Sequence, residues 1–152
     1  MIAVRLTWVA AFAFGLAAAP VAAQIAPWDA AKAGVVARQL VAATGELYDS
    51  FYKQPQPPST PRSARDYDRL KRDIRRIRNE ARGLAADLER GEGREETRAA
   101  YESLMVTVRW ARERARSVFT TQDVEERARA VAALLDQLAP FYEAGAPGAR
   151  SE

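Results

Sequence analysis

The residues of this chain that are best suited to chemistry are arginines that recur at helical spacing. Four of them lie four, three and four positions apart, which places them on one face of a helix: Arg65, Arg69, Arg72 and Arg76. A planar guanidinium binds a phosphate or a carboxylate through two parallel hydrogen bonds. This arginine stripe therefore predicts a surface that binds the phosphates of lipopolysaccharide or of anionic phospholipid, or an acidic partner.

Nearby carboxylates support a simpler interpretation of the same face. Asp66 lies three residues before Arg69, and Asp68 lies four residues before Arg72, so both pairs can form within one helix. Runs of charge on a long helix usually keep it solvated and bind nothing. The stripe is thus either a binding surface or a solvated helix face.

A second candidate surface lies around a tryptophan. Trp110 is off the apolar stripe of its own predicted helix and projects to another face with Val106, while Arg114 follows one turn later. Tryptophan and arginine are enriched at the centres of protein interfaces. The alternative is that the twist of the bundle turns Trp110 under a loop or against the first helix.

Catalytic, metal and cofactor chemistry finds little support in the sequence. The chain has no histidine and no cysteine, which excludes a serine–histidine triad, imidazole-ligated haem and the usual zinc sites. Four carboxylates recur seven residues apart: Asp66, Asp73, Glu80 and Asp87. Neighbours at this spacing are about 10 Å apart on a helix, too far to share a proton or to bind a single ion. We therefore expect these carboxylates to pair with arginines of an adjacent helix. We therefore expect a protein that is not an enzyme, with no catalytic residue, no cofactor and no metal site.

The helix that carries the stripe is also the clearest element of the chain. Its apolar residues recur at intervals of three and four without a break, which is the seam of a helix packed against other helices: Tyr67, Leu70, Ile74, Ile77, Ala81, Leu84 and Leu88. One shoulder of the seam is acidic and the other carries Lys71 and Arg78. The pattern predicts a helix over residues 64–90, ended by Gly91 and Gly93.

Three further helices are predicted, over residues 28–52, over residues 94–119, and after a tight turn and cap over residues 120–123. The apolar face of the first is unusually wide, because Tyr48 and Tyr52 extend it, so this helix meets two neighbours, or one neighbour and a ligand. Gly45 interrupts it, and we interpret that glycine as permitting close helix approach. Pro140 predicts a kink in the last helix or an end near Leu138.

The connection over residues 53–62 is rich in proline, which predicts a stiff crossover between helices; its Pro-x-x-P spacings are the alternative, as a peptide-docking motif. The other connections are short. Together these features predict an all-α fold, an antiparallel up-down-up-down four-helix bundle over residues 24–143, with a flexible tail over residues 144–152.

The first 23 residues are predicted to be a signal peptide. Arg5 precedes an alanine-rich apolar run, and small residues end at Ala23, where we expect cleavage and export to the periplasm or the exterior. The alternative is an uncleaved membrane anchor. Cleavage removes Arg5 and lowers the formal net charge from +3 to +2, so nothing in the charge favours a nucleic-acid partner.

Two functions follow from these features. The first is a binding protein of the envelope, an adaptor or chaperone-like module that contacts an unknown protein or an anionic envelope component through the arginine stripe or through Val106, Trp110 and Arg114. The second is a carrier that holds a small apolar or amphipathic ligand within the bundle. A mid-bundle cavity lined by Ala43, Ala81 and Leu104 would favour the carrier, whereas a filled core with an exposed Trp110 would favour the adaptor.

Overall fold

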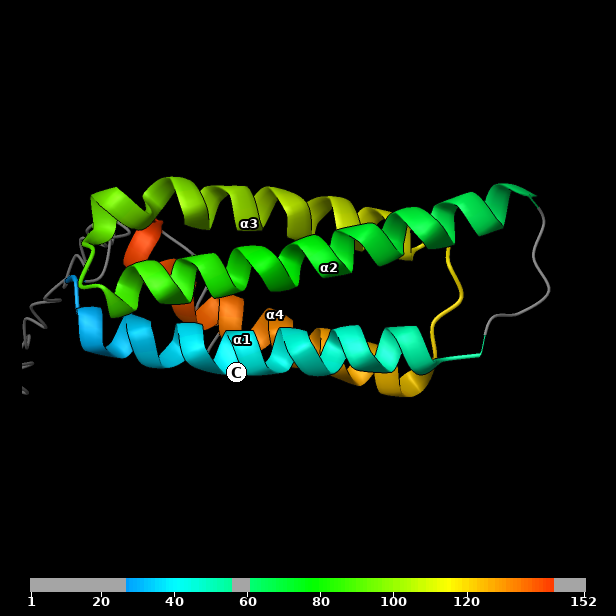
Figure 1. The fold of residues 1–152 in the computed structure, drawn as a ribbon, viewed down its shortest axis with the longest axis horizontal. Coiled ribbons are helices and arrows are strands. Elements are labelled where there is room, and N and C mark those ends of the chain that lie inside the picture. Colours follow the sequence, from blue (N-terminus) through cyan, green and yellow to red (C-terminus); the bar gives the residue numbers. More distant parts are fainter. Residues whose placement is uncertain (1–26, 56–60, 144–152) are drawn as a thin grey trace, which may run out of the picture.

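The computed structural model describes residues 27–55 and 61–143, which form four helices and no strands. Their order is α1 (Ala30–Lys53), α2 (Pro61–Glu89), α3 (Arg94–Ala115) and α4 (Gln122–Tyr142) (Figure 1). The all-α class and the four-helix bundle are therefore confirmed. The predicted signal peptide, residues 56–60 of the proline-rich connection and the predicted tail lie outside the described residues.

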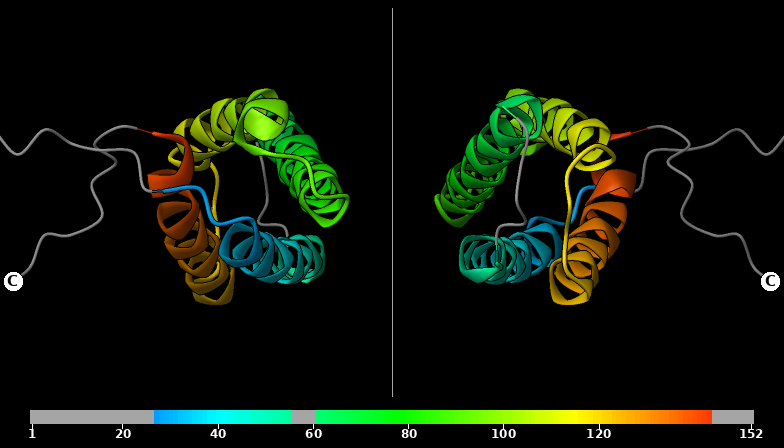
Figure 2. Two further views of the ribbon diagram at one scale, coloured as in Figure 1. Left: turned by 90° about the vertical axis from the view of Figure 1, so that its left-hand side faces the viewer. Right: turned by 90° about the vertical axis from the view of Figure 1, so that its right-hand side faces the viewer.

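The four helices surround a common axis (Figure 2). Their buried side chains form one apolar core. Helix α1 packs against both α2 and α4, and α2 packs against α3, whereas α3 and α4 make few contacts with each other. The wide apolar face of α1 is thus explained by two neighbouring helices, which was the first of its two predicted explanations. The weak packing between α3 and α4 leaves one side of the bundle less closed than the others.

Local sequence sets the helix ends. Asp29 caps α1 by accepting the Lys32 N–H at 3.0 Å, and that bond is the main reason why the pKa of this carboxyl is lowered. After α2, Gly91 has φ +84, and the N–H groups of Gly91 and Glu92 bond back to the carbonyls of Leu88 and Asp87. This is the Schellman arrangement, in which glycine tolerates the left-handed conformation that ends a helix.

The predicted end of α3 was wrong, and one of the two alternatives predicted for α4 is excluded. Helix α3 ends at Ala115 and not at Phe119, because the chain tightens into turns in which Ser117 and Val118 bond back three residues. Phe119 is consequently 54% exposed and does not join the core. Helix α4 continues through Pro140 to Tyr142 and does not end near Leu138.

Aromatic contacts extend α4 to Tyr142. The Tyr142 ring stacks on Tyr101 with centroids 4.2 Å apart and meets Trp28 edge-on, while its hydroxyl lies 2.9 Å from the Thr97 Oγ1. Burial raises the pKa of both the Tyr101 and the Tyr142 hydroxyls above the ordinary tyrosine value. Trp28, Tyr101, Phe141 and Tyr142 thus gather in one aromatic cluster, in which Trp28 also approaches Phe141 edge-on.

The two shoulders of α2 face different helices. On the basic shoulder, Lys71 lies over the Tyr52 ring at 4.1 Å and Arg78 over the Tyr48 ring at 3.8 Å, so the cations cover the tyrosines of α1. On the acidic shoulder, Asp73 pairs with Arg114 of α3. Charge on the two sides of one seam thus matches α2 to its two neighbours.

The interpretation of Gly45 as a point of close helix approach was wrong, because a Cβ added at Gly45 would meet no atom within 4 Å. We therefore expect Gly45→Ala to raise the free energy of unfolding by about 0.5–1 kcal/mol through helix propensity. Urea unfolding monitored by circular dichroism measures this. Gly91→Ala is the opposite control and should be destabilising, since φ at Gly91 is positive. Loss of stability in Gly45→Ala would contradict the prediction.

Candidate functional site

The arginine stripe lies on the exposed surface of α2. All four of its side chains belong to exposed residues. Arg69 lies 3.8 Å from Asp66, as predicted, and Arg76 lies 2.9 Å from Glu80. The predicted Asp68–Arg72 pair does not form, and Arg65 and Arg72 make no ion pair within the described part of the chain.

These ion pairs are weak constraints on the stripe. The Arg69 side chain is 56% exposed and the Arg76 side chain 66% exposed, so water screens both pairs. Exposed pairs of this kind contribute about 0–1 kcal/mol. A phosphate or carboxylate of a partner can therefore compete for these guanidinium groups at small cost.

The tryptophan predicted for a partner surface is exposed. Trp110 is 61% exposed and Val106, one turn before it on α3, is 48% exposed. Both therefore face solvent, and the alternative in which the fold turns Trp110 under a loop or against α1 was wrong. Most large apolar side chains of the bundle are buried, so two adjoining exposed ones form an unusual patch.

A surface hollow joins the tryptophan to the stripe. It measures about 390 Å³ and lies between α2 and α3, lined by Asp73, Arg76, Val106, Thr107, Trp110 and Arg114. Arg76 of the stripe thus lies beside Trp110, an adjacency that the spacing within either helix cannot reveal. Arg114, bound to Asp73, is held in place at the edge of this tryptophan hollow.

The predicted pairing of the four heptad-spaced carboxylates with an adjacent helix holds in part. Asp73 pairs with Arg114 of α3 as predicted, whereas Glu80 pairs with Arg76 of its own helix and accepts the Ser103 hydroxyl of α3 at 2.9 Å. Asp66 and Asp87 instead pair within or just beyond α2, with Arg69 and Arg90. Long arginine side chains reach a carboxylate one turn away as easily as one on the next helix.

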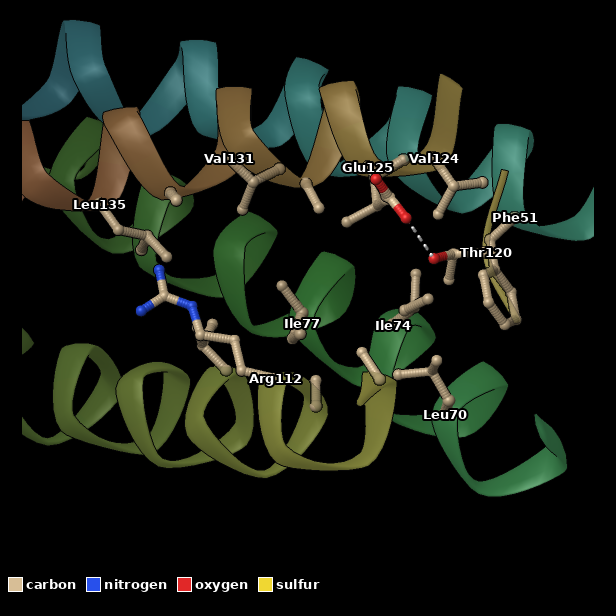
Figure 3. A pocket seen from close by; sticks show the side chains of 16 residues that line it. Phe51, Leu70, Ile74, Ile77, Arg112, Thr120, Val124, Glu125, Val131 and Leu135 are labelled. Carbon is tan, nitrogen blue, oxygen red and sulfur yellow. Dashed lines mark hydrogen bonds between the residues drawn. The ribbon is translucent and has the colours of Figure 1, made fainter. Parts of the chain in front are cut away.

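An apolar hollow opens on the other side of the bundle, between α3 and α4. It measures about 150 Å³, and side chains from all four helices and from the α3–α4 connection line it (Figure 3). Most are aliphatic or aromatic, including Phe51, Ile74, Ile77, Val131 and Leu135. It lies where α3 and α4 pack least closely.

The apolar hollow is not the mid-bundle cavity that would have favoured the carrier. Ala81 and Leu104 are fully buried, and neither they nor Ala43 line it. Its lining instead includes four alanines on the facing sides of α3 and α4: Ala111, Ala115, Ala128 and Ala132. These small residues were the available signal, but which helices face each other across a gap depends on the packing of all four.

Polar groups lie at the mouth of the apolar hollow. Arg112 of α3 lines it and makes no ion pair among the described residues. Glu125 of α4 accepts the Thr120 hydroxyl at 3.0 Å. Figure 3 shows the Arg112 guanidinium extending toward Leu135, away from Glu125, so the cation and the carboxylate occupy different parts of the mouth.

Within residues 27–55 and 61–143, no group of three or more acidic side chains is placed to hold a metal ion. In the same ranges, no helix combines the length and the apolar character that crossing a bilayer requires. Comparison with models of protein families, with curated proteins and with solved structures finds no match to this chain.

Proposed function

We propose that this protein is a non-enzymatic adaptor or chaperone-like module of the cell envelope that works by contact. Its docking face consists of the arginine stripe together with Val106, Trp110 and Arg114. The observation that carries the proposal is the exposed Trp110, which adjoins exposed Val106 and shares a hollow with Arg76. An exposed tryptophan beside arginines combines a large apolar contact area with directional hydrogen bonding to anions.

The local geometry suits docking in two ways. Arg114 is held by Asp73, so little side-chain freedom is lost when a partner contacts it. The other arginines extend from the hollow along α2 and form a strip of positive charge that attracts an anionic partner before contact. The expected partner is therefore an acidic protein surface or an anionic envelope component, with an apolar group that covers Trp110.

The proposal includes export and an antiparallel up-down-up-down order of helices. The sequence pattern of residues 1–23 supports export. Contacts between helix ends support the order, because the end of α1 meets the start of α2 where Phe51 stacks on Tyr67 at 4.8 Å. The start of α1 likewise meets the end of α4 through Trp28 and Tyr142.

Site-specific photo-crosslinking in the native host tests the docking face. A photoreactive phenylalanine analogue at position 110 is expected to form a discrete adduct with one envelope component. The matched control is the same analogue at Val35, which is 44% exposed on α1 and lies outside the docking face. Equal adducts at positions 35 and 110, or none at 110, would refute contact through this face.

A carrier is the second candidate function, and the apolar hollow between α3 and α4 favours it. Ligand sites in proteins are typically concave and mostly apolar, with a few polar groups that fix orientation. The hollow has this composition, with Arg112, Thr120 and Glu125 as its polar members. Carrier and docking functions use opposite sides of α3 and are tested separately.

A further inference from the structure

The apolar hollow has the size and the lining of a small-molecule site. Its volume is about 150 Å³. Apolar cavities of about that volume remain dry and bind molecules the size of benzene. The hollow therefore accepts an apolar group of roughly six carbons, and because it is open on one side, the end of a longer molecule can extend into its mouth.

The position of the hollow gives a ligand access to the interior, and a ligand bound there would stabilise the fold. Helix α1 packs closely against α2 and α4, and α2 packs closely against α3, whereas α3 and α4 make few contacts, and the hollow opens between these two helices. Side chains around an empty space lose dispersion contacts, which destabilises the fold. A ligand that fills the space restores those contacts and stabilises only the folded state.

The charged side chains at the mouth of the hollow favour a ligand with an anionic head group. Arg112 has no ion-pair partner within the described residues, while Glu125 already accepts the Thr120 hydroxyl. The guanidinium and the carboxylate point to different parts of the opening (Figure 3). An anion beside Arg112 gains a charge-assisted hydrogen bond, whereas a cation at Glu125 competes with an existing bond.

We propose that the hollow binds a medium-chain aliphatic carboxylate of about eight carbons. The chain lies among Ile74, Ile77, Val131 and Leu135, and the carboxylate accepts hydrogen bonds from Arg112. This assignment rests on the carrier function and adds the chemical class of the ligand and the residue that recognises its head group.

Isothermal titration calorimetry and thermal melting with octanoate, 1-octanol and octylamine test the assignment on the purified protein. Octanoate is expected to bind best and to raise the melting temperature. Arg112→Gln should weaken octanoate binding roughly fivefold to tenfold and leave 1-octanol binding unchanged. The matched control is Arg109→Gln, an exposed arginine of the same helix that does not line the hollow, and it should leave all three affinities unchanged.

Ala132→Phe tests the position of the ligand. Ala132 lines the hollow and is half-buried, so a larger ring there is expected to occupy the ligand volume and abolish binding of both octanoate and 1-octanol. Circular dichroism verifies that this variant is folded. Octanoate binding that both Ala132→Phe and Arg112→Gln leave intact would overturn the proposal.

The outcomes separate the head-group assignment from the carrier function. If 1-octanol binds as tightly as octanoate and Ala132→Phe abolishes both, the carrier function survives but the carboxylate assignment is overturned. Tighter binding of octylamine overturns the assignment in favour of Glu125. If none of the three probes binds, the carrier function fails as well. If the purified protein is instead a dimer and Ala132→Phe dissociates it, the occupant of the hollow is a second copy of this chain.

Discussion

Leu104→Asp is expected to abolish cooperative unfolding of this protein. Leu104 is fully buried in α3 and does not line either of the hollows described above. A carboxylate at this site would lie in the apolar interior without a partner, and burial of an unpaired charge costs about 4 kcal/mol or more. That cost is a large part of the 5–15 kcal/mol that typically separates folded from unfolded domains. Thermal melting monitored by circular dichroism measures the effect.

The matched control for Leu104→Asp is Val106→Asp. It places the same charge two residues later in the same helix, but Val106 is exposed, so water solvates the new carboxylate. We expect its melting temperature to lie close to that of the wild-type protein. If Leu104→Asp also melts cooperatively near the wild-type temperature, Leu104 is not part of the core.

The second large effect concerns the arginine stripe. Replacement of Arg65, Arg69, Arg72 and Arg76 by glutamine is expected to reduce binding to anionic vesicles roughly a thousandfold, because each basic residue near an anionic surface contributes about 1 kcal/mol. Co-sedimentation with phosphatidylcholine vesicles that contain phosphatidylglycerol measures it. Wild-type binding should weaken as salt is added, and vesicles of phosphatidylcholine alone should not bind.

A dispersed set of substitutions controls for net charge. Glutamine at Arg38, Lys53, Arg116 and Arg129 removes the same charge from exposed positions outside the docking face. If the stripe acts as a site, this control should retain most of the vesicle affinity of the wild-type protein. Equal losses in the two variants would show that only total charge matters, and the stripe would then be a solvated helix face.

The amphipathic pattern carries most of the information about the helices. Seven apolar residues from Tyr67 to Leu88 recur at intervals of three and four, and all of them are buried. Periodicity determines this because helical geometry alone decides which side chains share a face. Apolar periodicity did not predict where α3 and α4 end. Local turns end α3 early, and the contacts of Tyr142 with Trp28 and Tyr101 come from distant parts of the chain.

Some features of the candidate functional surfaces were predictable from spacing within one helix, and others depend on packing between helices. Spacing within one helix sufficed to group the four stripe arginines and to place Trp110 off the seam of α3. Spacing within one helix could not predict that Arg76 and Trp110 line the same hollow, because their proximity depends on the rotation of α2 and α3 relative to each other.

The apolar hollow is the clearest case of what only the tertiary structure decided. The periodicity of α2 places Ile77 in the middle of its apolar seam. In the structure Ile77 lines the apolar hollow, which opens between the loosely packed helices α3 and α4. Whether an apolar side chain meets another side chain or a void depends on how four helices share their contacts, and periodicity within one helix contains no information about that division. The sequence thus determined four amphipathic helices and their surface charge, while packing between helices decided the positions of the two hollows that the proposed functions use.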